Sequence, residues 1–110
     1  MVELQCHIHI KKNGTVFLDS PKTSLLRAID YHGSLSSAAK HLKISYQHAW
    51  NMIHEMNHIA PEPLVIKQRG GTNGGGAQLS PYGQRVLKEY SFIEAHVQSL
   101  VEKLNVEIAL

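Results

Sequence analysis

The feature that most constrains the fold is a pair of short helical segments with only a tight turn between them. Ser34 precedes the first segment and Ser45 precedes the second, and serine is a preferred helix-capping residue. Residues 43–44 are left for the turn, and the small side chains of Ala38 and Ala39 allow a close helix crossing. Two helices joined by about three residues are typical of a helix-turn-helix.

The segment that follows predicts a β-hairpin with a glycine-rich tip. In the second helix we expect a buried stripe, which comprises Ala49, Trp50, Ile53, Met56 and Ala60. Prolines at 61 and 63 end that helix, and residues 64–69 have strand character. Residues 70–76 contain five glycines and form the expected loop, after which residues 77–79 form the returning strand. A helix-turn-helix followed by such a hairpin predicts a winged helix.

The N-terminal residues predict a second hairpin and a first helix. Apolar residues alternate with polar ones over 2–10, Asn13-Gly14 is a turn signal, and 15–18 are β-branched or apolar. His7 and His9 would lie on the polar face. Asp19-Ser20-Pro21 then starts a helix that ends at Gly33. The expected fold class is α+β, mostly helical.

A long C-terminal helix is predicted after Ser80-Pro81, about 36 Å for roughly 24 residues. Its apolar residues recur at spacings of three and four, and one small domain cannot cover them all. We expect a homodimer, with packing against the N-terminal hairpin as the alternative. The expected dimer interface is Val86, Leu87, Tyr90, Ile93, Val97, Leu100, Val101 and Leu104. The chain is expected to be one domain, 1–110, with a hairpin (1–19), a helix-turn-helix and wing (20–79) and a dimerisation helix (80–110).

Composition favours a cytoplasmic protein over a secreted or membrane protein. The chain has 110 residues, a single cysteine and no apolar run of membrane-spanning length. Residues 20–88 hold eight basic and three acidic side chains, whereas the remainder holds three basic and six acidic ones. A basic middle favours a polyanionic partner such as double-stranded DNA, the alternative being a solvated basic surface.

The central residues resemble the DNA-binding domain of the molybdate-responsive transcriptional regulators of the ModE type, which are related to LysR-type domains. The matching stretches are "GSLSSAAK" (33–40), "ISYQHAWNMIHEMN" (44–57), "PLV" (63–65) and "GGTNGGGAQLS" (70–80). The resemblance covers about residues 20–92 and implies dimers that bind an operator palindrome. Gln47, Thr72 and Asn73 depart from the family, which often has basic residues there. The family's oxyanion-binding barrels are expected to be absent, so a separate effector-binding protein is a further candidate partner.

In a helix-turn-helix, the first half of the second helix meets base edges while neighbouring groups hold phosphates. Gln47 and Asn51 carry amides that can pair with adenine, and His48 and His54 are also expected on the outward side. Solvent exposure without DNA contact is the alternative. The remaining expected DNA-binding residues are Ser34, Ser36, Lys40, Lys43, Ser45, Tyr46, Lys67, Arg69, Thr72 and Asn73.

One motif indicates a different function, a zinc-dependent enzyme. His54-Glu55-Met56-Asn57-His58 satisfies H-E-x-x-H, in which two histidines bind zinc and the glutamate acts as general base. A catalytic site also needs a third ligand, and the candidates Glu89, Glu94 and His96 all lie in the C-terminal helix. A regulatory metal held by His54 and His58, with His41 or His48, is a milder alternative.

We therefore expect a dimeric, sequence-specific transcriptional regulator without catalytic activity, cofactor or bound metal. An architectural DNA-binding protein is the first alternative. A zinc-dependent protein that uses His54, Glu55 and His58 is the second.

Overall fold

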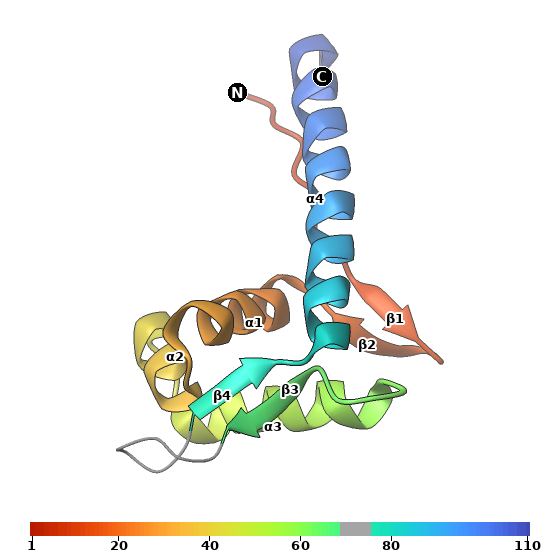
Figure 1. Ribbon diagram of the computed structural model, residues 1–110. Helices are drawn as coiled ribbons and strands as arrows, with labels where there is room; N and C mark the ends of the chain where they lie inside the picture. The colour runs from red at the N-terminus through yellow and green to blue at the C-terminus, as the bar shows by residue number, and fades with distance from the viewer. Residues whose placement is uncertain (69–75) are drawn as a thin grey trace.

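The computed structural model describes residues 1–68 and 76–110, which form a base of short elements from which one long helix projects (Figure 1). The described residues extend over 56 × 29 × 21 Å. The elements are β1 (Ile10–Lys12), β2 (Thr15–Leu18), α1 (Ser20–His32), α2 (Leu35–Leu42), α3 (Tyr46–Ile59), β3 (Val65–Gln68), β4 (Gly76–Leu79) and α4 (Pro81–Glu107). The predicted winged helix-turn-helix fold is confirmed. None of the helices in these residues is long and apolar enough to cross a membrane.

The helix boundaries follow the predicted capping residues. The side chains of Asp19, Ser34 and Ser45 each accept a hydrogen bond from a backbone N–H in the first turn of the helix that follows. Gly33 ends α1 with φ 74°, and Lys43 ends α2 with φ 58°, both in the left-handed region. These two left-handed residues turn the chain sharply at each end of α2.

The core is packed between the three short helices, β2 and the two wing strands. Leu25, Leu26, Ile29, Met56 and Leu64 are fully buried. The α3 stripe differs from the prediction at two positions. Trp50 is 39% exposed and Ala60 is half-buried, whereas Met52 is 7% exposed and takes a core position. The buried side of α3 is therefore rotated away from the wing relative to the predicted stripe.

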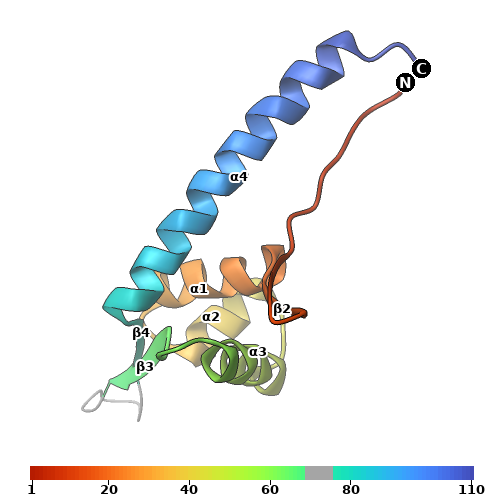
Figure 2. The same ribbon diagram turned by 90° about the vertical axis from the view of Figure 1, so that its right-hand side faces the viewer.

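The N-terminal hairpin is shorter than predicted. Its turn lies at Asn13 and Gly14, as expected, but only residues 10–12 pair with β2. The first nine residues form no strand, and Figure 2 shows them rising from the hairpin toward the far end of α4. There the Asn105 side chain accepts a hydrogen bond from Leu4 N at 2.7 Å and donates one to Leu4 O at 3.1 Å. The backbone of Leu4 therefore pairs with the side-chain amide of Asn105, and not with a neighbouring strand as the alternation of residues 2–10 predicts.

The wing strands are held to both neighbouring helices. β3 and β4 pair in antiparallel register, with Val65 opposite Leu79. Ala77 N donates to Gly33 O at 3.0 Å, which ties β4 to the end of α1. Asn57 of α3 binds the start of β3 through its side-chain amide. The predicted glycine-rich loop, residues 70–76, lies outside the described residues except for Gly76.

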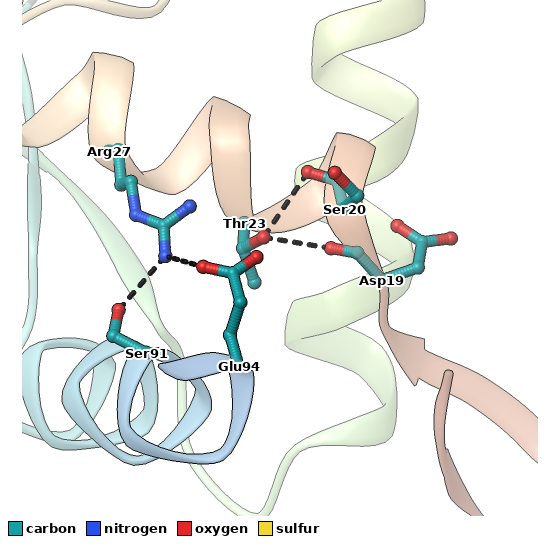
Figure 3. Close-up of polar contacts among 6 residues, drawn as sticks. All are labelled: Asp19, Ser20, Thr23, Arg27, Ser91 and Glu94. Carbon is teal, nitrogen blue, oxygen red and sulfur yellow. Dashed lines mark hydrogen bonds and ion pairs between the residues drawn. The ribbon is translucent and has the colours of Figure 1, made fainter. Parts of the chain in front are cut away.

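The N-terminus of α4 is fixed by short polar contacts. Ser80 Oγ donates to Pro63 O at 2.6 Å and accepts from Gly83 N at 2.9 Å. Further along, Arg27 reaches from α1 to α4, where its Nη2 donates to Ser91 Oγ at 2.9 Å and contacts Glu94 at 3.1 Å (Figure 3). These two groups of contacts lie roughly three turns apart on α4 and help to fix its direction.

Tyr90 lies in the core at 1% exposure, on the face of α4 that meets α1. Burial raises the pKa of its hydroxyl, while a hydrogen bond with Thr23 acts in the opposite direction. Thr23 is itself fully buried, and its hydroxyl donates a hydrogen bond to Asp19 O at 2.9 Å. This hydrogen bond is drawn in Figure 3. Tyr90 was expected at the dimer interface, and this placement corrects that expectation.

Candidate nucleic-acid interface

The outward side of α3 carries the polar residues that the sequence selects. Gln47, His48, Asn51 and His54 are all exposed. Gln47 Nε2 donates to Asn51 Oδ1 at 2.9 Å, so the two amides lie side by side one helical turn apart. This contact uses one donor and one acceptor, and each amide retains the complementary group for a further partner. The pair can therefore present both an acceptor and a donor to a base edge.

Two of the expected phosphate-binding serines also have a structural role. Ser34 and Ser45 accept hydrogen bonds from the backbone N–H groups of Ser37 and His48 respectively, each at 3.0 Å. Their hydroxyl protons are still able to donate to an acceptor outside the chain. Each serine also lies at a helix N-terminus, where backbone N–H groups and the helix dipole favour an anion.

Basic and polar residues surround these helix ends. Ser36 and Lys40 are exposed on α2, and Lys43 is exposed in the turn before α3. Lys67 is exposed on β3. These residues lie on the segments that flank α3, namely α2, the turn before α3 and β3. Three of the expected contacts, Arg69, Thr72 and Asn73, lie outside the described residues.

The flank of α3 that faces the wing is aromatic. Tyr46 is 54% exposed, and the Trp50 ring stacks on the His54 ring with centroids 4.9 Å apart and an interplanar angle of 7°. Trp50 was expected in the core and was therefore missed as a surface residue. The signal that could have found it is angular: Trp50 lies about 100° around the helix from Ala49, outside the centre of the buried stripe.

A groove separates this flank from β3. Trp50, His54, Ile66 and Lys67 contribute to its lining, and its volume is about 250 Å³. Asn57 closes one side of the groove, since its Oδ1 accepts from Leu64 N at 2.8 Å and its Nδ2 donates to Val65 O at 3.3 Å. Helix and wing are thus joined by a side chain that belongs to the helix.

The residues of the H-E-x-x-H motif each have a place in this fold. His54 stacks on Trp50, Glu55 contacts Lys22 Nζ at 3.5 Å, and Met56 is fully buried. Asn57 holds β3, and His58 is exposed with its ring 6.5 Å from that of His54. Across residues 1–68 and 76–110, no three His, Cys, Asp or Glu side chains come together in a way that could hold a metal ion.

The helices α1 to α3, the wing strands and the polar outer side of α3 define a winged helix-turn-helix domain. No family model matches the sequence. Among solved structures the fold resembles ArgP from Mycobacterium tuberculosis, with a TM-score of 0.54 and 18% sequence identity. That match covers 76% of this chain and 31% of ArgP. At this identity the likeness concerns the fold alone.

Curated relatives give the family. The chain is 44% identical over 92 residues to the molybdenum transport protein ModE of Azotobacter vinelandii, a match that covers 84% of this chain and 34% of that protein. It is 39% identical over 101 residues to the DNA-binding transcriptional dual regulator ModE of Escherichia coli, covering 92% and 38% respectively. Over most of its length the chain is thus homologous to regulators of the ModE type, and its fold agrees with a winged helix-turn-helix domain of that kind. It spans about a third of the length of these relatives.

Proposed function

We propose that this chain binds double-stranded DNA in a sequence-specific manner and regulates transcription. The observation that carries the proposal is the hydrogen-bonded pair of Gln47 and Asn51 on the exposed side of α3. An α-helix fits the major groove of B-DNA, and amide side chains pair with the N6 and N7 atoms of adenine there. The names of the relatives, transcriptional regulators among them, support the same function.

Contacts to the DNA backbone are proposed for the residues at the ends of the helices. Lys40, Lys43 and Lys67 supply exposed ammonium groups, and Ser34 and Ser45 supply hydroxyls at helix N-termini. Such contacts position a protein on the duplex and account for most of the salt dependence of binding, without reading the sequence. In this arrangement the lysines hold α3 in the groove while Gln47 and Asn51 discriminate among bases.

We further propose that α4 pairs with a second copy of the chain. Val86, Tyr90, Ile93, Val97, Leu100 and Leu104 form one stripe with alternating spacings of four and three. The chain's own core covers the first part of this stripe, since Tyr90 is buried and Val86 packs against the core. The last part is open, with Leu100 56% and Leu104 40% exposed. The proposed interface is therefore confined to the distal part of the helix.

The expected residues outside that distal stripe are covered within the chain. Val101 is 6% exposed, one turn before Asn105, which binds Leu4. Leu87 packs against the core. A dimer formed through Ile93, Val97, Leu100 and Leu104 would present two α3 helices to one duplex. Half-sites would then lie about 34–36 Å apart, one turn of B-DNA.

The proposal is tested by selecting bound duplexes from a random library, with a chelator present throughout. Recovery of a pseudo-palindrome is the expected result and indicates a metal-independent, sequence-specific dimer. Binding with a steep salt dependence but no preferred site would replace the proposal with an architectural role. Enrichment that occurs only when zinc replaces the chelator would favour the metal-dependent alternative.

A further inference from the structure

Trp50 lies in the groove between α3 and β3, in a position that the proposed base and lysine contacts do not explain. It is 39% exposed, although tryptophan is a large apolar residue, whereas Met52 and Met56 of the same helix are buried in the core. Its ring stacks on the ring of His54, with 4.9 Å between centroids. An exposed aromatic face on a proposed DNA-binding surface is typical of a contact residue.

The geometry of B-DNA indicates what this face would contact. The major and minor grooves are separated by a single sugar-phosphate strand. If α3 lies in the major groove and the wing reaches the adjacent minor groove, one strand must pass between helix and wing. The groove lined by Trp50, Ile66 and Lys67 lies between those two elements. Because Asn57 fixes β3 to α3, the width of this passage is set by the fold.

The chemistry of the lining matches a sugar-phosphate strand. Trp50 and Ile66, 39% and 37% exposed, offer apolar surface that suits a deoxyribose ring. Lys67 adds an exposed ammonium group in the same groove, which suits a phosphate.

We infer that Trp50 and Lys67 bind one DNA strand between α3 and the wing, with the indole ring against a deoxyribose and the ammonium group on a neighbouring phosphate. This contact would set the register in which Gln47 and Asn51 meet the bases. The inference rests on the proposed DNA-binding function. It adds a positioning contact that discriminates weakly among sequences, because every nucleotide carries the same sugar and phosphate.

The first measurement uses the chain's own fluorescence, since Trp50 is its single tryptophan. The unmodified chain is titrated with a selected duplex and with a random duplex, and acrylamide, a neutral quencher, is added before and after saturation. The inference predicts that both duplexes lower the accessibility of Trp50 to acrylamide. Unchanged accessibility in a saturated complex would place Trp50 outside the interface and overturn the inference, while the DNA-binding function itself would stand.

The second measurement compares variants by binding affinity and its salt dependence. Trp50→Ala should weaken binding to both duplexes by a similar factor, about tenfold, without changing the salt slope. Trp50→Phe keeps an aromatic ring and should lose less. Lys67→Ala should instead lower the salt slope by about one. Phe92→Ala is the matched control, because Phe92 is also exposed and also contacts a histidine, His96, but lies on α4.

The outcomes separate the inference from the function on which it rests. Circular dichroism of each variant first establishes that it folds. Folded Trp50→Ala that binds both duplexes as Phe92→Ala does would overturn the inference. A loss limited to the selected duplex would also overturn it, since that result indicates a base contact. Failure of the unmodified chain to bind any duplex would overturn the proposed function together with this inference.

Discussion

Gly83 in the first turn of α4 lies directly against the backbone carbonyl of Leu64. A Cβ atom built at this glycine would be 2.1 Å from Leu64 O, a distance that real Cβ atoms do not adopt. The same carbonyl accepts a hydrogen bond from Ser80 N at 2.8 Å. The start of α4 is thus seated on the segment that leads from α3 into the wing, and only glycine allows that approach.

Gly83→Ala should therefore destabilise the fold, although glycine to alanine in a helix usually stabilises it. Either α4 or the Leu64 carbonyl must move, and such overpacking costs about 1–3 kcal/mol of unfolding free energy. Chemical denaturation measures the change, with Lys88→Ala at an exposed position of the same helix as control. A stabilised Gly83→Ala variant would show that α4 does not pack as described.

Asn57→Ala should loosen the wing from α3. The substitution removes the acceptor of Leu64 N and the donor to Val65 O, and unpaired part-buried backbone groups cost about 1–3 kcal/mol. Both the unfolding free energy and the DNA affinity should fall, since the proposed interface includes both elements. His58→Ala, one residue away and exposed, is the control and should change neither by much. If the two substitutions change the unfolding free energy and the DNA affinity equally, Asn57 does not hold the wing to α3.

Local signals in the sequence were sufficient to predict the helix-turn-helix. Capping by Ser34 and Ser45 and the left-handed Gly33 are decided by hydrogen bonds within a few residues, so the residue types alone indicate them. The resemblance to a known family pointed to the same segments. For the proposed site, the exposure of Gln47 and Asn51 followed from the helical period once the buried side of α3 was approximately known.

The predictions that were wrong concern features that depend on residues far away in the sequence. The alternation of residues 2–10 favours a strand, but no strand within residues 1–68 and 76–110 pairs with residues 1–9, and Asn105 binds Leu4 from 101 positions away. Trp50 and Met52 are both apolar, and which of them is buried depends on the elements that pack against α3, chiefly α2, β2 and α1. A pattern of apolar residues fixes the buried side of a helix only to within about one residue's angular step of 100°.

Stability at alkaline pH should depend on Tyr90. Its folded-state pKa is raised, chiefly by burial, above the value of about 10 expected in the unfolded chain. The unfolded state therefore loses its proton first, so the stabilisation is complete below about pH 10 and decreases as pH rises through the folded-state pKa. For each protein, the melting temperature between about pH 9 and 11 is compared with that protein's own value at pH 8. This decrease should be smaller in Tyr90→Phe than in the unmodified chain. Tyr31→Phe, at an 86% exposed position, should retain the normal fall.

Asn51→Ala should relax base preference at one position of each half-site. A bidentate amide–adenine contact contributes about 1–3 kcal/mol of discrimination. Competition between the selected duplex and single-base variants of it measures this loss. Lys43→Ala serves as the contrasting variant, because loss of a phosphate contact should weaken all duplexes alike. If Asn51→Ala weakens selected and random duplexes by the same factor, Asn51 does not read a base.

Leu104→Glu should convert the proposed dimer into monomers without unfolding them. Leu104 is 40% exposed and lies on the open part of the α4 stripe, so a charge there costs little within one chain. In a paired helix the two glutamates would face each other in an apolar seam, where unpaired charges are strongly unfavourable. Sedimentation equilibrium reports the mass, and circular dichroism reports the helix content. Val106→Glu is the control, because Val106 is 87% exposed and lies off the stripe on the same helix. Leu104→Glu should therefore have the mass of a monomer and Val106→Glu that of a dimer, and Leu104→Glu should bind a duplex with two half-sites more weakly. The two variants should bind a duplex with a single half-site equally well. If Leu104→Glu remains dimeric, the second copy binds elsewhere on the chain.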